Sequence, residues 1–149
     1  MPKLIIEKLL KILRNEKRSD VIDIYTDGSH KGKWGSWAFV IVQNSVVIKE
    51  SSGRERKTNS HRMEFQAAIE ALQYLKPGSK ANLHSDSREL IKTAESNTKT
   101  NRLNSDQIEI LRTLILKHKI SWKWVKAHSG KAFNERCDEL CVQARSIFP

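Results

Sequence analysis

Four acidic residues stand where their carboxylates could act together. Asp27 and Asp86 each follow a short segment with β-strand alternation, Glu64 lies in the first turns of an expected helix, and Asp138 lies in an expected helix near the end of the chain. In open α/β sheets, ligands gather at the carboxyl ends of the strands. Asp27 and Asp86 are expected at such ends on two neighbouring strands. Taken singly, each acid is more simply interpreted as a turn, a helix cap or a surface charge.

Taken as a set, crowded carboxylates favour one kind of chemistry. Like charges repel, so the set would be costly unless a cation neutralised it. Oxygen ligands select Mg²⁺ or Mn²⁺ rather than zinc. Two such ions, about 3.5–4 Å apart, are the usual apparatus for in-line displacement at a phosphodiester. If the four acids meet in space, they therefore indicate a divalent metal site for displacement at a phosphodiester.

The composition is that of one globular domain with a basic surface. The chain has 149 residues and a formal net charge of +10, from 27 Lys and Arg against 17 Asp and Glu. This surplus favours polyanionic partners through counterion release, although a basic surface that only maintains solubility explains it equally well. No apolar run approaches the ~18 residues of a membrane helix, so no membrane partner is expected. Cys137 and Cys141 are interpreted as apolar core residues in a reducing, cytoplasmic protein.

The hydrophobic pattern after residue 20 predicts a mixed α/β domain. Strands are expected at residues 21–26, 34–43, 46–52, 81–84 and 120–125, and helices at residues 60–76, 87–95, 105–118 and 134–147. Asn44 and Ser45 indicate a hairpin turn. The first three strands are expected to be antiparallel, and the later strands, joined by crossovers, parallel. Trp122 and Trp124 alternate with Lys123, so both are expected on one face of a strand and in the core.

The first 20 residues form a separate unit in this interpretation. Residues 3–14 predict an amphipathic helix, because Ile6, Leu9, Leu10 and Leu13 fall on one face. Six basic side chains decorate the segment, and residues 15–20 are polar, as in a linker. The expected organisation is therefore a basic helix and linker over residues 1–20, followed by a catalytic domain over residues 21–149.

Several motifs then follow one another in a fixed order. They are Tyr25-Thr26-Asp27-Gly28-Ser29, Arg62-Met63-Glu64 leading to Ala67-Ala68-Ile69-Glu70-Ala71-Leu72, Ser85-Asp86-Ser87, and Trp124-Val125-Lys126-Ala127-His128-Ser129-Gly130 with Asn134-Glu135-Arg136-Cys137-Asp138-Glu139-Leu140. Each motif alone has low specificity, but their order and spacing are specific. Together they resemble the type 1 ribonuclease H family, and most closely its bacterial members, over about residues 21–148.

The resemblance implies both a fold and an activity. The fold is a five-stranded mixed sheet with helices on both sides. The activity is endonucleolytic hydrolysis of the RNA strand of an RNA–DNA hybrid, which leaves 5′-phosphate and 3′-hydroxyl ends. The family's four metal-binding carboxylates match Asp27, Glu64, Asp86 and Asp138, and its loop histidine, which assists proton transfer or product release, matches His128. Two Mg²⁺ ions, or Mn²⁺, are the implied cofactors of a monomer that binds hybrid.

Substrate contacts are expected at residues that can reach the 2′-hydroxyls or backbone of the hybrid. The positions that match are Gly28, Ser29, Asn59, Ser60, His61 and Arg88. The absence of a side chain at Gly28 would let the substrate backbone approach closely. The family usually has asparagine or glutamine at the position of His61, often glutamine at that of Arg88, and commonly threonine at that of Asn59. The residues at these three positions therefore differ from those common in the family, but each can still form hydrogen bonds.

A second departure concerns the basic handle, an extra helix and a Lys- and Trp-rich loop in many bacterial members. Here that interval is only the stretch of residues 96–104, with Lys99 and Arg102. Our hypothesis is that the basic helix at residues 3–14 replaces the handle. The alternative is that this helix only packs its apolar face on the domain.

Other functions remain open at this point. The missing handle is compatible with the ribonuclease H portion of a mobile-element protein, although no polymerase segment precedes residue 21. A non-catalytic hybrid-binding module would have little reason to keep four acids together. A resolvase or integrase of similar fold is disfavoured by the motifs around His128 and Asp138.

Overall fold

The computed structural model describes residues 2–16, 20–96 and 104–147, with the side chains of the first helix described up to Leu10. Two sequence predictions therefore fall outside the described residues. One concerns the linker residues 17–19, and the other concerns Lys99 and Arg102 in the interval that replaces the handle. The rest of the domain is described continuously on either side of that interval.

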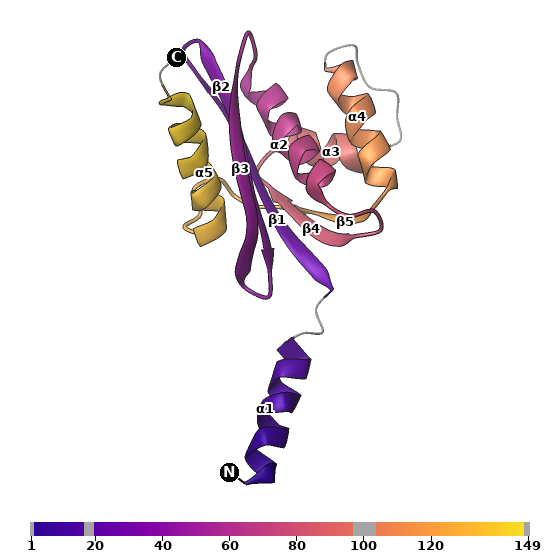
Figure 1. Ribbon diagram of the computed structural model, residues 1–149. Coiled ribbons are helices and arrows are strands. Elements are labelled where there is room, and N and C mark those ends of the chain that lie inside the picture. Colours follow the sequence, from indigo (N-terminus) through magenta and orange to yellow (C-terminus); the bar gives the residue numbers. More distant parts are fainter. Residues whose placement is uncertain (1, 17–19, 97–103, 148–149) are drawn as a thin grey trace.

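A five-stranded mixed sheet forms the centre of the domain (Figure 1). The strands are β1 (Val21–Lys31), β2 (Trp34–Gln43), β3 (Val46–Arg56), β4 (Lys80–Ser85) and β5 (Lys119–Trp124), in the order β3-β2-β1-β4-β5. Strands β1, β2 and β3 are antiparallel neighbours, whereas β4 is parallel to β1 and β5 is parallel to β4. The predicted fold class and the predicted strand directions are confirmed.

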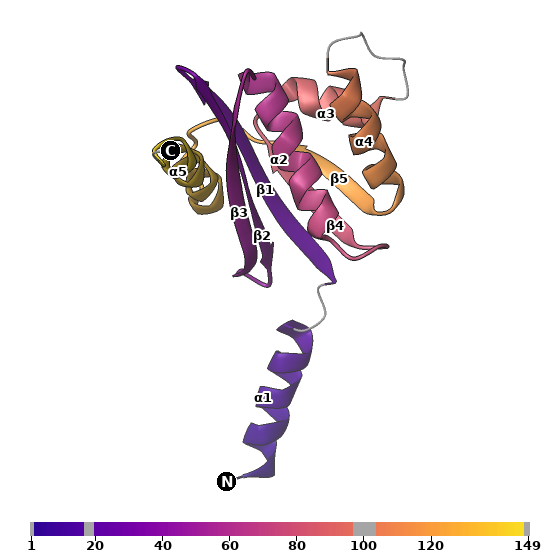
Figure 2. The same ribbon diagram turned by 45° about the horizontal axis from the view of Figure 1, so that its top comes forward.

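Helices cover both faces of this sheet (Figures 1 and 2). The helices α2 (Ser60–Tyr74), α3 (Arg88–Glu95) and α4 (Ser105–Leu116) lie on one side, and α5 (Ala132–Arg145) lies on the other. The larger apolar cluster fills the space under α2, α3 and α4, with Phe65, Leu72 and Leu83 fully or almost fully buried. The smaller cluster lies between α5 and strands β1 and β2. Two separate cores thus fix the sheet from either side.

Two strands are several residues longer than their sequence pattern predicted, and β4 is longer by one residue at each end. Strand β1 continues to Lys31 instead of ending before Asp27, and β3 continues to Arg56 instead of Ser52. The reason is pairing, because Asp27, Gly28 and Ser29 are each paired with a residue of β2. Pairing with β2 therefore keeps these three polar residues in the strand, although their sequence alone indicates a turn. The tight turn predicted at residues 44 and 45 is confirmed, since both have positive φ.

The tryptophans of β5 have different surroundings. Trp122 packs against the larger core as predicted. Trp124 is 45% exposed, so the prediction that it is a core residue is wrong. It stands at the carboxyl end of an edge strand, where no neighbouring strand covers its outer side. Cys137 and Cys141 are buried free thiols in the smaller core, which confirms that they serve as apolar core residues.

The first helix, α1 (Lys3–Glu16), lies apart from the sheet and from the other helices in Figures 1 and 2. Its described apolar side chains, Leu4, Ile5, Ile6, Leu9 and Leu10, are each at least 44% exposed. The alternative that α1 packs its apolar face on the domain is therefore not what the structure shows. None of the helices in the described residues is long and apolar enough to span a membrane.

Candidate active site

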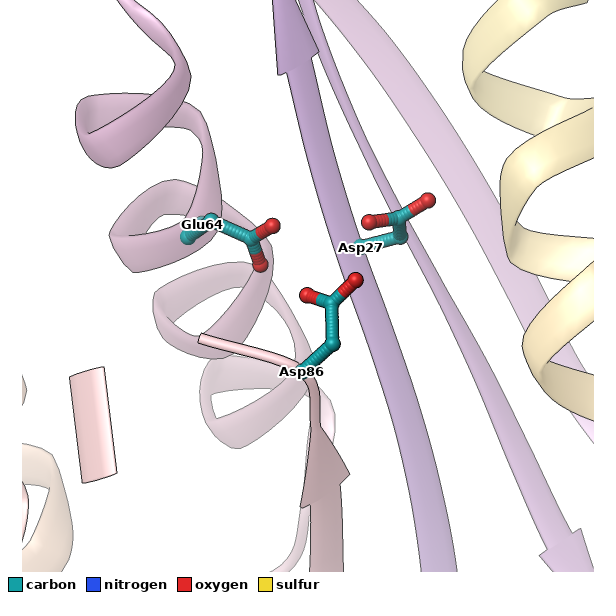
Figure 3. Close-up of side chains that lie close together, drawn as sticks. All are labelled: Asp27, Glu64 and Asp86. Carbon is teal, nitrogen blue, oxygen red and sulfur yellow. The ribbon is translucent and has the colours of Figure 1, made fainter. Parts of the chain in front are cut away.

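Three carboxylates from distant parts of the chain converge beside the middle of the sheet (Figure 3). Asp27, Glu64 and Asp86 each offer one oxygen, and these three oxygens lie within 4.8 Å of one another. Asp27 comes from β1, Glu64 from α2, and Asp86 from the turn that follows β4. The predicted clustering of these acids is therefore observed. Asp138 is not part of this tight group but lines the same cleft.

The parallel pairing of β1 with β4 brings Asp27 and Asp86 together. Tyr25 is paired with His84, two residues before each aspartate. The rings of Tyr25 and His84 also stack, with their centroids 4.5 Å apart. Both aspartates therefore lie at about the same height along the sheet. Asp27 is a residue of β1 that is still paired with β2, whereas Asp86 follows the carboxyl end of β4, as predicted.

Gly28 allows α2 to bring Glu64 against the sheet. A Cβ atom at Gly28 would lie 2.3 Å from the backbone nitrogen of Glu64 and 2.4 Å from the carbonyl carbon of Met63. The space beside this glycine is therefore filled by helix backbone. The absence of a side chain at Gly28 therefore permits the approach of α2, and the approach of a substrate backbone at this residue stays a prediction.

The first turn of α2 is held from two directions. The side chain of Asn59 caps the helix, because its oxygen accepts a hydrogen bond from the backbone N–H of Arg62 at 2.9 Å. Arg62 donates two hydrogen bonds to Asp106 of α4, at 2.9 and 3.1 Å. Gln107 donates to the carbonyl oxygen of Arg62 at 2.9 Å. These contacts fix the helix turn that carries Glu64. Arg62 belongs to a quoted motif but was given no role there, and nothing in the sequence pattern singled out Gln107.

The charges in the cluster oppose their own ionisation. Burial, and then the negative charges of Asp86 and Asp138, raise the pKa of Asp27 to about 7. Burial and the charges of Asp27 and Asp86 raise the pKa of Glu64 well above its usual range. The Oε2 atom of Glu64 is buried without a hydrogen-bond partner among the described residues. An unpaired buried oxygen facing other carboxylates fits a divalent cation, because the cation would supply the missing positive charge.

A cleft of about 170 Å³ contains the remaining catalytic candidates. Its lining includes Asp138 of α5 and His128 of the loop between β5 and α5. His128 is exposed and has a φ of 52°, in the left-handed region. Its charge acts in the opposite direction to those of the acids and lowers the pKa of Asp27. The structure thus places all five predicted catalytic residues at one cleft.

The predicted substrate-binding residues are more dispersed. Gly28 and Ser29 line the cleft, although the hydroxyl of Ser29 accepts a hydrogen bond from Arg145. Ser60 and His61 are exposed at the start of α2 and do not belong to the described lining of the cleft. Arg88 begins α3, and its guanidinium lies over the ring of Trp124, 4.0 Å from the centroid.

The cleft also includes residues that the sequence reasoning did not select. Lys126, Asn134 and Glu135 contribute to its lining. All three lie within the motifs quoted above, so the signal was present, but nothing in their residue types distinguished them from neighbours on the surface. Trp124 was assigned to the core, yet its indole N–H donates to the carbonyl oxygen of Asp86 at 3.2 Å.

The comparison with known proteins agrees with this geometry. The family model of RNase H matches residues 19–146. The chain belongs to the ribonuclease H family. The ribonuclease H of Francisella philomiragia is 39% identical over 142 residues, which cover 86% of this chain and 92% of that protein. The ribonuclease H of Caldanaerobacter subterraneus is 36% identical over 143 residues, which cover 86% and 93%. The predicted family of metal-dependent endonucleases is thus confirmed.

Solved ribonuclease H structures share the fold. The N-terminal RNase H domain of a Mycobacterium tuberculosis protein has a TM-score of 0.72 at 20% identity, covering 83% of this chain and 92% of that chain. LC9-RNase H1, described as a type 1 RNase H with the type 2 active-site motif, has a TM-score of 0.69 at 19% identity, covering 83% and 71%. These likenesses support the architecture of the sheet and its helices.

Proposed function

We propose that this ribonuclease H hydrolyses the RNA strand of RNA–DNA hybrids and leaves 5′-phosphate and 3′-hydroxyl ends. The observation that carries the proposal is the convergence of Asp27, Glu64 and Asp86 at one cleft in a chain of this family. One oxygen from each of these residues lies within 4.8 Å of the other two, and Glu64 also has a buried oxygen without a hydrogen-bond partner among the described residues. Such a group of oxygens is suited to hard cations. A module that only binds hybrid would bear the cost of this cluster without using it.

The metal site in this proposal consists of Asp27, Glu64, Asp86 and Asp138, which would hold two Mg²⁺ ions or Mn²⁺. When bound, the ions lower the pKa of an attacking water and stabilise the leaving 3′-oxygen. The residues of the chain serve to fix the carboxylates on four separate elements and to keep Glu64 and Asp27 largely out of bulk water. Because all four acids belong to one copy of the chain, a monomer suffices. The free thiols suit the cytoplasm.

His128 would move a proton or assist product release at the open side of the cleft. It is exposed, stands between Ala127 and Ser129, and lines the cleft together with Asp138. Histidine is suited to this role because its usual pKa lies near neutral pH.

Substrate recognition would use residues at the cleft and residues at the start of α2. Ser29 and the backbone at Gly28 face the cleft, Arg88 lies beside Asp86, and Asn59, Ser60 and His61 surround the start of α2. The Oδ1 atom of Asn59 is engaged in the helix cap, so its contact with hybrid would come from the amide nitrogen. Together these groups would read the 2′-hydroxyls and the phosphates of an A-like duplex.

The test uses an end-labelled RNA–DNA hybrid beside duplex RNA and duplex DNA, each with Mg²⁺, with Mn²⁺ and with EDTA. We expect cleavage of the hybrid's RNA strand alone, no cleavage in EDTA, and a loss of at least about 10³-fold in Asp86→Asn. Asp20→Asn removes the same charge at an exposed position outside the cleft and should retain full activity. Hybrid binding without cleavage in either metal would contradict the proposal and favour a binding module.

A further inference from the structure

Trp124 connects the end of β5 to the turn that carries Asp86. Its side chain is 45% exposed, which is unusual for a residue of this size. Its indole N–H and the face of its ring each form an interaction. The indole N–H donates a hydrogen bond to the carbonyl oxygen of Asp86 at 3.2 Å. The face of the ring lies 4.0 Å from the guanidinium carbon of Arg88. One side chain therefore contacts both a metal-binding carboxylate residue and a cation beside it.

The hydrogen bond between Trp124 and Asp86 lies just beyond the last paired residues of β4 and β5. Ser85, the last residue of β4, is paired with Trp124, and the backbone N–H of Val125 donates to the carbonyl oxygen of Ser85 at 2.9 Å. Beyond Ser85 the chain leaves the sheet and turns into α3. The turn is closed from within, since Ser85 Oγ accepts from the N–H of Ser87 at 3.0 Å and Ser87 Oγ accepts from the N–H of Leu90 at 3.2 Å. The indole adds a contact from the neighbouring strand to the peptide of Asp86.

We infer that Trp124 is a positioning residue for hybrid cleavage, acting through Asp86 and through Arg88. This inference rests on the proposed function. Through the hydrogen bond, Trp124 fixes the backbone of Asp86, so the carboxylate stays in the cluster with Asp27 and Glu64. Through its ring, Trp124 holds the guanidinium of Arg88 beside the cleft, where a phosphate of the hybrid would bind.

The two contacts should affect different steps of the reaction. A carboxylate that moves by a fraction of an ångström changes the metal site and therefore the chemical step, which is sensitive to such misplacement. Arg88 forms no hydrogen bond or ion pair with the carboxylates of Asp27, Glu64 or Asp86 among the described residues. A flexible arginine must lose rotamer freedom when it binds a phosphate. Stacking on the indole removes part of that freedom in advance, so the ring contributes to affinity.

Trp124→Phe and Arg88→Met separate the two contacts. Phenylalanine keeps an aromatic face for Arg88 but has no N–H for Asp86, whereas methionine keeps an unbranched apolar stem in place of the Arg88 side chain and removes the guanidinium with its charge. The measurements are kcat and KM on the hybrid, the dependence of KM on salt, and Mn²⁺ affinity by electron paramagnetic resonance. Mn²⁺ affinity is read without substrate and so reports Asp86 independently of turnover. Trp34→Phe is the matched control, since Trp34 also lies against arginines, Arg54 and Arg56, but does not line the cleft.

For Trp124→Phe we expect kcat to fall about tenfold and Mn²⁺ binding to weaken several-fold, with KM within about twofold of the original. For Arg88→Met we expect KM to rise about tenfold and the logarithmic salt dependence to fall by about one, with kcat little changed. Trp34→Phe should change none of these quantities. A merely structural role for Trp124 would lower the melting temperature without this division between kcat and KM.

Two results would overturn the inference. One is an unchanged kcat and Mn²⁺ affinity in Trp124→Phe, and the other is the same loss in Trp34→Phe as in Trp124→Phe. Failure of the proposed function would look different, because the unaltered protein would then not cleave hybrid at all. In that case a weakened Mn²⁺ affinity in Trp124→Phe would still support the positioning of Asp86, and an unchanged affinity would refute it.

Discussion

Asp27 and Glu64 are carboxylates whose surroundings disfavour their charged forms. Burial is the largest cause for both, and each is also close to other acids. A protein selected only for stability would replace such a group with an apolar or amide side chain. Their presence at the cleft therefore indicates a stability cost that is offset when a cation binds, and this cost should be measurable as a dependence on pH.

The metal-free protein should become less stable as the pH rises. The pKa of Asp27 is about 7 in the folded chain against an ordinary value of 3.8, so between these values the folded state binds more protons than the unfolded state. The free energy of unfolding should thus fall from about pH 4 upward and level off above the folded pKa, and Glu64 should act in the same direction. Urea unfolding in EDTA at pH 5, 6, 7 and 8 measures this. In Asp27→Asn the slope should be smaller, and an equal slope would contradict the assignment.

The same protons compete with the metal. A divalent cation binds the ionised carboxylates, so Mg²⁺ should raise the melting temperature more at pH 8 than at pH 6. In Asp27→Asn the Mg²⁺ effect should be small at both values. An equal Mg²⁺ effect at pH 6 and pH 8 in the unaltered protein would mean that Asp27 does not titrate in this range.

His128 should matter for turnover and not for metal binding. Removal of a general acid or base costs about 10²-fold or more in rate, so His128→Ala should lower kcat about 10²-fold while Mn²⁺ affinity stays within about twofold. Steady-state kinetics and a Mn²⁺ titration provide the two readings. The control is His30→Ala, since His30 is also exposed and lies outside the cleft lining. A full loss of Mn²⁺ binding in His128→Ala would instead identify His128 as a metal ligand.

At the scale of elements, the contact between α2 and β1 sets the position of Glu64. Gly28→Ala would place a methyl group 2.3 Å from the backbone nitrogen of Glu64, and backbone cannot move aside as a flexible side chain can. We expect a loss of about 3 kcal/mol in unfolding free energy together with a fall in kcat. Gly78→Ala is the control, because Gly78 has a φ of 82° and open space around it, so it should cost about 1 kcal/mol and leave kcat unchanged. Urea unfolding and hybrid kinetics measure both, and an unaltered kcat in Gly28→Ala would contradict this role.

The sequence was informative where periodicity or a motif carried the signal, and less so where pairing between strands decided the structure. The directions of the strands followed from the connections between them, and the strands that lead to Asp27 and Asp86 were correctly expected to be neighbours. The extension of β1 through Asp27 and Gly28 was missed, because only pairing with β2 makes these residues part of a strand. The exposure of Trp124 was missed because alternation assigns a side chain to a face of the sheet but does not show how far neighbouring elements cover that face.

At the scale of the whole molecule, the site exists only when the two sides of the domain are assembled. Asp27 comes from the sheet, Asp86 from the turn that follows β4, Glu64 from a helix on one face, and Asp138 from the helix on the other face. No local segment contains more than one of these acids. Loss of either core should therefore disrupt metal binding together with folding, which is expected for a site built on rigid elements.

The charge of the molecule is also unevenly divided along the chain. Residues 1–18 hold six basic and two acidic side chains, a large share of the formal net charge of +10. The helix α1 lies apart from the sheet and from the other helices (Figures 1 and 2), and the side chains of Lys3 and Lys8 are exposed. We propose that residues 1–20 act as a separate basic segment that binds hybrid, while residues 21–149 form the catalytic domain.

Deletion of residues 1–18 should accordingly weaken hybrid binding and leave the chemical step unchanged. We expect KM to rise several-fold, kcat to stay within about twofold, and the logarithmic salt dependence of binding to fall by about 0.9 for each phosphate that the protein no longer neutralises. A variant that keeps the helix but carries Lys3→Gln, Lys8→Gln and Lys11→Gln tests whether charge is the cause, and it should reproduce most of the effect. Kinetics at several salt concentrations measure all three quantities. An unchanged KM and salt dependence in the shortened protein would mean that α1 has no part in hybrid binding, and that the affinity comes from the domain alone.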